Sequence, residues 1–274
     1  MNRIALVTGA TRGVGRGIAR ALGAEGLTVY LTGRDEAGLA VVADEVRAAG
    51  GEARPIRCDH ADDADVGRLF ARIREEEGRL DLLVNNAAAV HKAELSRTDP
   101  FWERSLVLNE MIDVGLRSNY VAAWHAAPLL LAAGPALLVN ISFYGAVSYF
   151  CGPAYGAAKA GNDKMSYDMA VDFDSSDVTV VAFWPGFVRT EDLEAMDPAA
   201  MPEDMRALLP SFESPDFSGH VIAAMLRDPD RQSFSGRAVI GAEMARHYGI
   251  SDEGRQPPDF TATMGKPVPF PYMG

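Results

Sequence analysis

The stretch Ile4-Ala5-Leu6-Val7-Thr8-Gly9-Ala10-Thr11-Arg12-Gly13-Val14-Gly15 decides the fold of this chain. It begins as an apolar run of the strand type, continues in glycines spaced Gly-x-x-x-Gly-x-Gly, and leads into a helical pattern with apolar residues from Ile18 to Leu22. A strand, a glycine-rich turn and a helix in this order favour a dinucleotide site. The glycines let the backbone approach a pyrophosphate, and the helix N-terminus offers free N–H groups to the anion. Taken alone, the turn could equally be a plain strand-to-helix loop.

A second set of residues, Ser142, Tyr155 and Lys159, has the chemistry of a proton-transfer site. If Tyr155 begins a helix, Lys159 lies one turn further on the same face. A nearby ammonium group favours the phenolate and lowers the pKa of a tyrosine from its usual value of about 10. The Ser142 hydroxyl can donate a hydrogen bond to a carbonyl oxygen. A surface pair is the alternative for the tyrosine and lysine alone, but their occurrence beside the glycine-rich turn favours catalysis.

Apolar runs of strand length alternate with helical patterns along the whole chain. We expect strands at 4–8, 27–33, 53–58, 81–85, 136–142, 178–184 and 237–241. We expect helices at 13–25, 35–49, 62–78, 101–133 with a break, 153–173 and 215–227. This alternation predicts an α/β fold, a single-domain doubly wound parallel sheet of about seven strands flanked by helices on both faces. Ligands of such sheets bind beyond the carboxyl ends of the strands.

The composition disfavours several classes of protein. The chain has 274 residues, 48% of them hydrophobic, and a net charge of -12, so we expect one large core and neither a nucleic-acid nor a membrane partner. Cys58 and Cys151 lack Cys-x-x-Cys spacing, which predicts a reduced, cytoplasmic setting. The chain enters its first strand without an apolar leader, so we expect no secretory signal. His91 and His125 lack ligand spacing, so we expect no metal site.

The segment 120–141 is apolar over a length that could cross a bilayer. Pro128 and the pair Gly134-Pro135 interrupt it. We therefore predict a buried helix that ends near Ala133 and a core strand after it, in preference to a membrane span.

Five motifs in order resemble those of the short-chain dehydrogenase/reductase family over roughly residues 1–240. Thr8 to Gly15 is similar to the cofactor turn of the family, and Ser142, Tyr155 and Lys159 fall on its catalytic positions. The other three motifs are Cys58-Asp59, where the family places an aspartate near adenine, Asn85-Asn86-Ala87-Ala88, which is similar to an Asn-Asn-Ala-Gly signature, and Pro185 to Thr190, which is similar to the segment beside the nicotinamide. Further stretches, including Cys58-Asp59-His60 and Val114-Gly115-Leu116-Arg117, resemble one mammalian subgroup of the family.

This resemblance implies a Rossmann-type fold and an oxidoreductase that interconverts a carbonyl and an alcohol by hydride transfer, with Tyr155 as general acid or base. The residues that it implies in cofactor binding are Gly9, Thr11, Arg12, Gly13, Val14, Gly15, Arg34, Asp59, Asn86, Ala87, Tyr155, Lys159, Pro185, Gly186, Val188 and Thr190. The implied partners are a small-molecule carbonyl or alcohol and further copies of the chain, as a homodimer or homotetramer. The apolar faces of 101–133 and 153–173 would pair the subunits.

The end of the second expected strand bears on the cofactor. Gly33 stands where NAD-dependent members of the family usually carry an aspartate, and Arg34 follows it. Arg12 and Arg34 together suit bidentate recognition of a 2′-phosphate, so we expect NADP(H). NAD(H) remains an alternative, with Asp35 bound to the ribose and both arginines solvated.

One position departs from the family pattern. Val114-Gly115-Leu116 stands where the family has an asparagine that helps to hold a water in the proton relay, and Asn119 lies one turn later. Glycine allows a local helix break and still offers its carbonyl. We therefore expect a relay through the Gly115 carbonyl, or a different relay without the asparagine, and a kink in the helix near Gly115.

Aromatic and methionine side chains predict an apolar, bulky substrate, although they could equally be ordinary core. The candidate pocket residues are Phe143, Tyr144, Tyr149, Phe150 and Phe187, with a lid at 191–212 that carries Met196, Met201 and Met205. The stretch 92–112 would wall the site. We expect one domain over 1–245 that includes the lid, and a C-terminal extension over 246–274 that is either loose, as is usual for termini, or packed over the site or a neighbouring subunit.

Two other functions fit the same motifs. One is an NAD-dependent alcohol or polyol dehydrogenase, and the other is a weakly active dinucleotide-binding sensor or structural protein. The preferred cofactor separates the first from the NADP(H)-dependent carbonyl reductase, and the intact set of Ser142, Tyr155 and Lys159 argues against the second.

Overall fold

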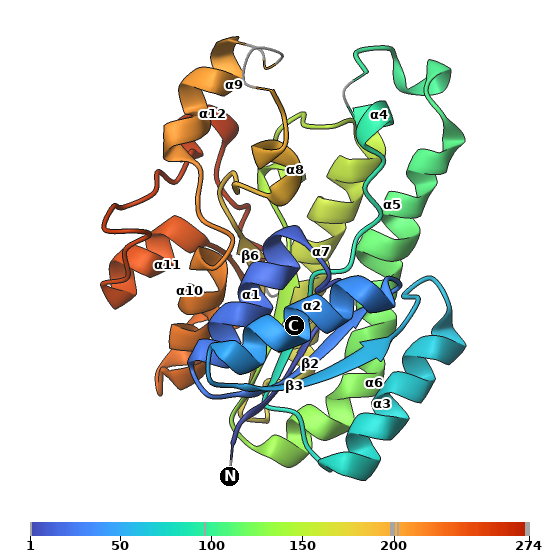
Figure 1. The fold of residues 1–274 in the computed structure, drawn as a ribbon, viewed down its shortest axis with the longest axis vertical. Helices are drawn as coiled ribbons and strands as arrows, with labels where there is room; N and C mark the ends of the chain where they lie inside the picture. The colour runs from blue at the N-terminus through green and yellow to red at the C-terminus, as the bar shows by residue number, and fades with distance from the viewer. Residues whose placement is uncertain (1, 96, 198–200, 202, 272–274) are drawn as a thin grey trace.

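A seven-stranded sheet forms the middle layer of the chain in a computed structural model, which describes residues 2–95, 97–197, 201 and 203–271 (Figure 1). The strands are β1 (Ile4–Val7), β2 (Thr28–Gly33), β3 (Glu52–Arg57), β4 (Leu82–Asn85), β5 (Ala136–Ile141), β6 (Val178–Trp184) and β7 (Arg237–Ile240). They lie in the order β3-β2-β1-β4-β5-β6-β7, and every neighbouring pair is parallel. This order confirms the doubly wound fold that the sequence predicts.

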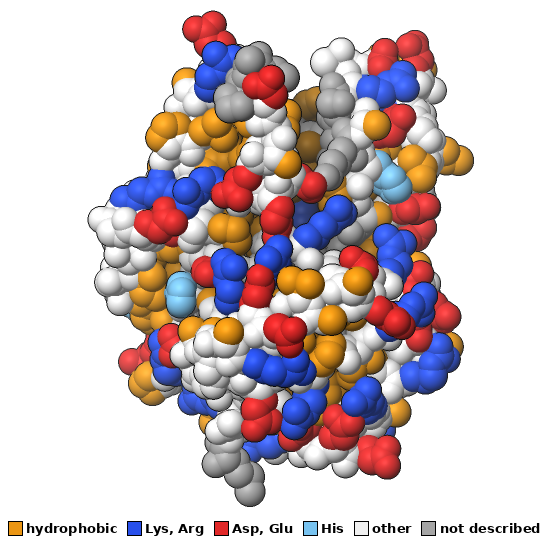
Figure 2. Space-filling view, in the orientation of Figure 1, with side chains coloured by type: hydrophobic (Ala, Val, Ile, Leu, Met, Phe, Trp, Pro, Cys, Tyr) orange, Lys and Arg blue, Asp and Glu red, His pale blue; other side chains and the backbone are white. Residues whose placement is uncertain are grey.

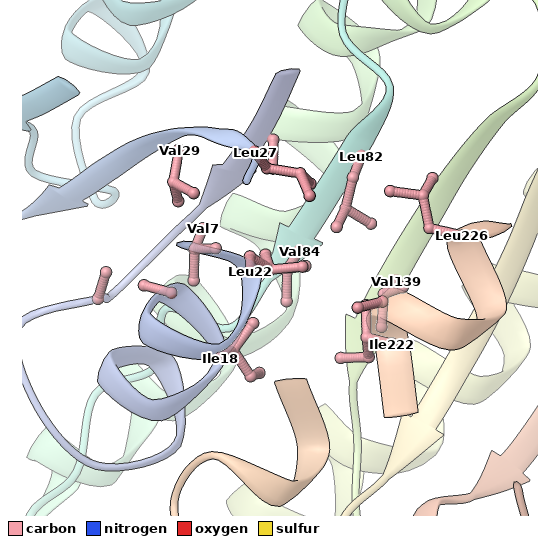
Figure 3. Packing of buried hydrophobic residues seen from close by; sticks show 14 of the residues in the cluster. Val7, Ile18, Leu22, Leu27, Val29, Leu82, Val84, Val139, Ile222 and Leu226 are labelled. Atoms are coloured by element: carbon pink, nitrogen blue, oxygen red, sulfur yellow. The ribbon is translucent and has the colours of Figure 1, made fainter. Parts of the chain in front are cut away.

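Helices cover both faces of the sheet. One face packs against α1 (Gly13–Ala24), α2 (Glu36–Ala48) and α10 (Phe217–Arg227), and the other packs against α3 (Asp63–Glu76), α6 (Ser118–Ala133) and α7 (Pro153–Asp172). Figure 3 shows the first of these interfaces, where Ile18 and Leu22 of α1 meet Val7 and Val84 of the sheet. Each fully buried side chain of this size contributes about 2 kcal/mol of burial free energy.

The sheet is apolar on both sides because both sides are covered. All the residues of β1, β4, β5 and β6 are buried. The edge strand β3 instead exposes four of its six residues, Glu52, Arg54, Pro55 and Arg57. The glycine-rich turn leaves the carboxyl end of β1, next to the central strand β4, so the fold brings it close to the Asn85-Asn86 motif.

The region 101–133 is broken into short pieces, as predicted, and only its second half is a regular helix. The pieces are η1 (Phe101–Glu103), η2 (Leu106–Asn109), α5 (Glu110–Ile112), a π-helical turn η3 (Asp113–Arg117) and α6. The π-helical turn is centred on Gly115, where the sequence predicts a distortion. Pro128 lies inside α6 without ending the helix.

The sequence missed several short helices. They are α4 (Lys92–Leu95), α8 (Glu191–Glu194), α9 (Glu203–Leu208), α11 (Gly241–Tyr248), α12 (Thr261–Met264) and the 3₁₀ turns η4 (Tyr144–Ala146), η6 (Leu209–Ser211) and η7 (Arg231–Phe234). The boundary expected between residues 245 and 246 falls inside α11. Residues 198–200 and 202 of the expected lid, and the side chain of Met205, lie outside the described part of the chain.

The C-terminal segment packs against the body of the molecule in its described part, so of the two alternatives that the sequence leaves open it takes the packed one. The Phe260 ring lies 5.0 Å from the Phe187 ring and 6.3 Å from the Tyr144 ring, centre to centre. Further on, the Phe270 ring lies 5.6 Å from the Tyr167 ring on α7. These aromatic contacts give the tail apolar burial that its proline-rich sequence does not suggest.

No helix in the described ranges is long and apolar enough to cross a membrane. The same residues contain no group of three or more side chains that could hold a metal ion.

Candidate active site

A cavity of about 970 Å³ opens at the carboxyl ends of the strands. Figure 2 shows the hollow between the segments that carry α8 and α9 and the segment that carries α4, with Lys and Arg side chains along its lower edge. All of the residues predicted for catalysis and cofactor binding line this one cavity. The fold therefore brings together five motifs that are far apart in the sequence.

The glycine-rich turn is locked in place by the motif after β4. The Asn86 side chain donates hydrogen bonds to the carbonyl oxygens of Thr8 and Gly9, at 2.9 and 3.0 Å. The Thr8 hydroxyl accepts hydrogen bonds from the backbone N–H groups of Asn86 and Ala87. A Cβ atom at Gly15 would lie 2.4 Å from both the Asn86 amide nitrogen and the Gly9 carbonyl oxygen. Only glycine fits this turn, as the cradle of a pyrophosphate requires.

An acid that the sequence did not single out meets the N-terminus of α1. One Glu191 oxygen accepts a hydrogen bond from the Gly13 N–H at 2.9 Å, and the other pairs with Arg16 at 3.0 Å. Glu191 belongs to α8, the first turn of the lid. A carboxylate is stabilised by the free N–H groups and the dipole at a helix N-terminus. The contact therefore fastens the start of the lid to the cofactor turn.

An acidic side chain at the end of β2 would meet the Thr11 side chain, which would have to move. A Cβ atom at Gly33 would lie 2.6 Å from the Thr11 methyl group. The Asp35 carboxylate accepts a hydrogen bond from the Ala37 N–H and caps α2, so it is already bound to the helix. Arg34 is exposed and lines the cavity. Arg12, which follows Thr11 in the sequence, is also exposed and also lines the cavity.

The catalytic set lies on the wall between β5 and α7. The Lys159 ammonium group donates a hydrogen bond to the Ile141 carbonyl at 3.0 Å and lies 5.5 Å from the centre of the Tyr155 ring. The Ser142 hydroxyl donates to the Lys159 carbonyl at 3.0 Å. Pro153 occupies the first turn of α7, where a fixed φ favours helix formation, so Tyr155 and Lys159 lie one turn apart as predicted.

Burial moves the pKa values of the tyrosine and the lysine. It raises the pKa of Tyr155 well above its ordinary value of 10, and Cys151 acts in the same direction. Burial lowers the pKa of Lys159 to about 8, against the smaller, opposite effect of Asp163. The expected lowering of the tyrosine pKa is therefore not met here, because desolvation of the buried phenol is the largest effect on that pKa. At neutral pH Tyr155 is a phenol and Lys159 is mostly an ammonium.

The Gly115 carbonyl already accepts two hydrogen bonds. The side-chain amides of Asn119 and Asn162 donate to it at 3.1 and 2.8 Å. Gly115 lies in the π-helical turn, and such turns are frequent at functional sites. Because both lone pairs of the carbonyl are occupied, a water relay through Gly115 requires one amide to leave.

Part of the predicted pocket lines the cavity. Phe143, Phe150, Phe187, Met196 and Leu193 of the expected lid do so, together with Val90 and Val114, which the sequence missed. Tyr144 is fully buried beneath them, and Tyr149 is 83% exposed and lies outside the lining, so both pocket predictions are wrong. Met201 is also buried core. Tyr144 begins the 3₁₀ turn Tyr144–Ala146, and Tyr149 lies beyond it.

Carboxylates also line the cavity. Glu110, Asp113 and Asp192 do so, and Glu110 lies 3.1 Å from the His91 ring nitrogen. The lining of the cavity therefore combines apolar and acidic side chains.

The end of the lid is tied to the C-terminal segment. The Ser214 N–H donates to Asp252 at 2.9 Å, and Arg255 donates to the carbonyl oxygens of Pro210 and Phe212. Glu213 between them is fully buried, and a Cβ atom at Gly186 would lie 2.5 Å from its carboxyl group. Burial raises the pKa of Glu213 to about 8.

Comparisons with known proteins agree with this geometry. The family model described as short chain dehydrogenase matches residues 3–200. Dehydrogenase/reductase SDR family member 1 from mouse and from human are each 38% identical to the chain, over 94% of it and 86% of their own length. This is the mammalian subgroup that the short stretches resemble. Cis-4-hydroxycyclohexanecarboxylate dehydrogenase from Sinomonas cyclohexanicum is 35% identical over 76% of the chain and 80% of its own length.

Solved structures of similar fold include two with a bound nicotinamide cofactor. A variant of actinorhodin polyketide ketoreductase with NADPH superimposes with a TM-score of 0.75 at 26% identity, over 87% of this chain and 95% of that one. A metagenomic short-chain oxidoreductase in complex with NADP superimposes with a TM-score of 0.69 at 30% identity, over 87% and 96%.

Proposed function

Because the chain belongs to the short-chain dehydrogenase/reductase family and is an NAD(P)-dependent oxidoreductase, we propose that it reduces an apolar ketone or aldehyde with NADPH, or catalyses the reverse oxidation. The observation that carries this proposal is the position of Tyr155, Lys159 and Ser142 in the wall of the same cavity as the glycine cradle. A phenol, an ammonium group and a hydroxyl at one place suit a carbonyl oxygen that gains negative charge.

Each side chain has a defined role in this proposal. Ser142 turns its O–H from the Lys159 carbonyl toward the substrate oxygen and holds it. Tyr155, a phenol at neutral pH, donates its proton to that oxygen as charge develops. Lys159 stabilises the resulting phenolate and would bind the nicotinamide ribose. Bound NADPH supplies the hydride.

The phosphate-bearing cofactor is favoured by the end of β2. Thr11 fills the space that an acid at position 33 would need, and Asp35 is bound to the start of α2. Arg12 and Arg34 are then the charged side chains that line the cavity beside Gly33, and guanidinium groups recognise phosphates well. In the same proposal, Gly9 to Gly15, Asn86 and Ala87 hold the pyrophosphate and ribose, Asp59 meets the adenine, and Pro185 to Thr190 border the nicotinamide.

The substrate is proposed to be bulky, apolar and without negative charge. Phe143, Phe150 and Phe187 give an aromatic wall that suits a large apolar group. Glu110 and Asp113, which also line the cavity, would repel an anion.

Assembly and location follow from resemblance and composition. The chain is proposed to form a homodimer or homotetramer through α6 and α7, because Tyr120 and Trp124 on α6 are 55% and 65% exposed. Cys58 and Cys151 are both free thiols, which supports a cytoplasmic setting. We also propose that residues 1–245 form one domain and that residues 246–274 are its C-terminal extension.

The test is oxidation of NADPH, and separately of NADH, by the purified protein with a panel of aldehydes, ketones, quinones and steroids. Turnover should be faster with NADPH and should fall at least about 1,000-fold in Tyr155→Phe, because the proton donor is lost while the rest of the site stays. The affinity of Tyr155→Phe for NADPH, measured by fluorescence titration, should stay within a few-fold of the parent.

Other results would favour the alternative functions. Preference for NADH with polyols would indicate the NAD-dependent dehydrogenase. Tight NADPH binding without turnover on any compound would indicate a sensor or structural role. Full activity of Tyr155→Phe would contradict the assignment of the catalytic acid.

A further inference from the structure

A buried carboxyl group lies directly behind the catalytic set. Asp163 is on α7, one helical turn after Lys159, and is 5% exposed. It is not among the described residues that line the cavity. One of its oxygens accepts a hydrogen bond from the Trp184 indole N–H at 3.0 Å, and its carboxyl group also interacts with the Ser142 side chain. A buried acid needs such partners, since an unpaired carboxylate is costly to bury.

The bond between Asp163 and Trp184 joins two parts of the active site. Trp184 is the last residue of β6 and immediately precedes Pro185 and Gly186, which line the cavity. Asp163 is on the helix that carries Tyr155 and Lys159. One carboxyl group therefore fixes the catalytic helix relative to the segment that borders the proposed nicotinamide position.

Asp163 also supplies the negative charge that acts on Lys159. The Lys159 ammonium group has the Ile141 carbonyl as a hydrogen-bond partner, and the charge that raises its pKa against the effect of burial is that of Asp163. The groups that face the Asp163 carboxyl are Lys159 on its own helix, Ser142 after β5 and Trp184 on β6. All three lower the pKa of Asp163, which burial raises to about 6. Between pH about 6 and about 8, both groups are charged.

We propose that Asp163 is a positioning residue of the catalytic set, whose buried carboxylate keeps Lys159 in its ammonium form and fixes Ser142 and the end of β6. It acts through these residues and does not touch the substrate. The proposal rests on the proposed function, because Lys159 and Ser142 matter to the reaction only if the chain is the reductase described above. The charge of Lys159, on which the proposal depends, can be measured without any turnover.

The chain contains only four lysines, Lys92, Lys159, Lys164 and Lys266, so the lysine side chains can be followed one by one. We would label lysine with ¹³C at Cε, assign the Lys159 signal with Lys159→Arg, and titrate it by NMR. In the parent, Lys159 should titrate near pH 8. In Asp163→Asn, which keeps the shape of the side chain and still accepts from Trp184, the midpoint should fall by about one pH unit.

A matched control separates charge from position. Asp168→Asn removes the same charge from an exposed site on the same helix, where the carboxylate pairs with Lys164. It should leave the Lys159 midpoint unchanged. An equal midpoint for Lys159 in the parent and in folded Asp163→Asn would overturn the proposal, whatever the activity of the protein.

The pH profile of turnover gives a second readout in the active enzyme. The alkaline limb of kcat should move to lower pH in Asp163→Asn. In Trp184→Phe, the carboxylate loses a donor that lowers its pKa, so the acidic limb should move to higher pH. A merely structural role would lower the whole profile without moving either limb.

The two variants also cover failure to fold. If Asp163→Asn does not fold, the limb shift in Trp184→Phe decides the question, and an unshifted acidic limb overturns the proposal. If the parent shows no Tyr155-dependent turnover, the proposed function fails, and the Lys159 titration still decides whether Asp163 sets the charge of the lysine.

Discussion

Single residues at the end of β2 set the chemistry of the proposed cofactor site. An acid at position 33 would meet the Thr11 side chain, and Asp35 is taken by the N-terminus of α2, so the two flanking arginines remain to meet a ligand. In the proposed function, the choice between NADP(H) and NAD(H), which differ by one phosphate, thus depends on Arg12 and Arg34, two side chains with little other structural role.

Arg12→Ala and Arg34→Ala should each raise the KM for NADPH about tenfold or more, because a charge-assisted hydrogen bond contributes about 1.5–3 kcal/mol. The KM for NADH should change little, since it lacks the phosphate. Steady-state kinetics with both cofactors measure this. Arg72→Ala on α3, which removes an exposed arginine paired with Glu76, is the control. Equal losses with NADPH and NADH would show that the arginines do not read the phosphate.

Two glycines with similar neighbours in sequence should respond in opposite ways to alanine. Gly15→Ala brings a methyl group to 2.4 Å from Asn86 and Gly9, so it should lower the midpoint of thermal unfolding and weaken cofactor binding at least tenfold. At Gly115 the nearest atom to a new Cβ is Ala158 Cβ at 3.8 Å, so Gly115→Ala should be neutral or stabilise by up to about 1 kcal/mol. Chemical denaturation and fluorescence titration with NADPH measure both. Comparable destabilisation by the two changes would refute the contrast.

The residues of the site that could be predicted are those whose spacing itself carries the chemistry. The glycine turn, the Tyr155–Lys159 pair and Ser142 depend on local geometry, and the structure brings them into one cavity. The sequence does not predict the roles of Glu191 and Asp163, because their hydrogen-bond partners, Gly13 and Trp184, come close to them only in the folded chain. The sequence predicts a lowered pKa for Tyr155, whereas burial raises it. Desolvation depends on everything that packs around the ring, which the spacing of residues does not show.

At the scale of elements, the expected lid at 191–212 ends in a segment held by the C-terminal part of the chain. Asp252 and Arg255 bind the backbone of residues 210–214, and Glu213 is buried against Gly186 in the same place. The position of this segment therefore depends on residues well outside it.

The stability of this junction should depend on pH. The pKa of Glu213 rises from an ordinary 4.5 to about 8 on folding, so between these values the folded chain binds the additional proton. The contribution of Glu213 to stability is therefore present at pH 5 and is lost as the pH rises through 8. Glu213→Gln cannot ionise and should be more stable than the parent at pH 9 but similar at pH 5. Urea unfolding at both pH values measures this.

Glu194→Gln, at an exposed position of α8, is the matched control and should show no such dependence on pH. A Glu213→Gln variant with the same advantage or deficit at pH 5 and pH 9 would contradict the buried, protonated state of the carboxyl group.

The elements that could be predicted were the long periodic ones. The seven strands and the six long helical regions fall close to their expected positions. The short helices α8, α9 and α12 have too few residues for a periodic pattern, and α11 lies directly after β7 with no turn residue between them to mark its start. The packing of Phe260 on Phe187 could not be foreseen, because the contact joins segments that are not neighbours in sequence.

At the scale of the whole molecule, we expect cofactor binding to raise the unfolding midpoint of the whole chain, because the chain is proposed to be a single folding unit. At a concentration one hundred times its Kd, a ligand specific to the folded state stabilises it by about 2.7 kcal/mol. Equal concentrations of NADPH and NADH should therefore raise the unfolding midpoint unequally, with NADPH ahead. Differential scanning calorimetry should show one transition that moves as a whole. A larger shift with NADH, or a transition that splits so that only part moves, would contradict the proposed preference or the single unit.

The strand order has a consequence for the way the chain is made. β1 pairs with β2, and β2 pairs with β3 at one edge of the sheet. β4 pairs with the free side of β1. Each later strand then pairs with the strand made just before it, at the edge opposite to β3. No later strand has to be inserted between two that are already paired. A chain that leaves the ribosome from its N-terminus can therefore extend this sheet in the order of its synthesis, and each strand finds its partner already in place.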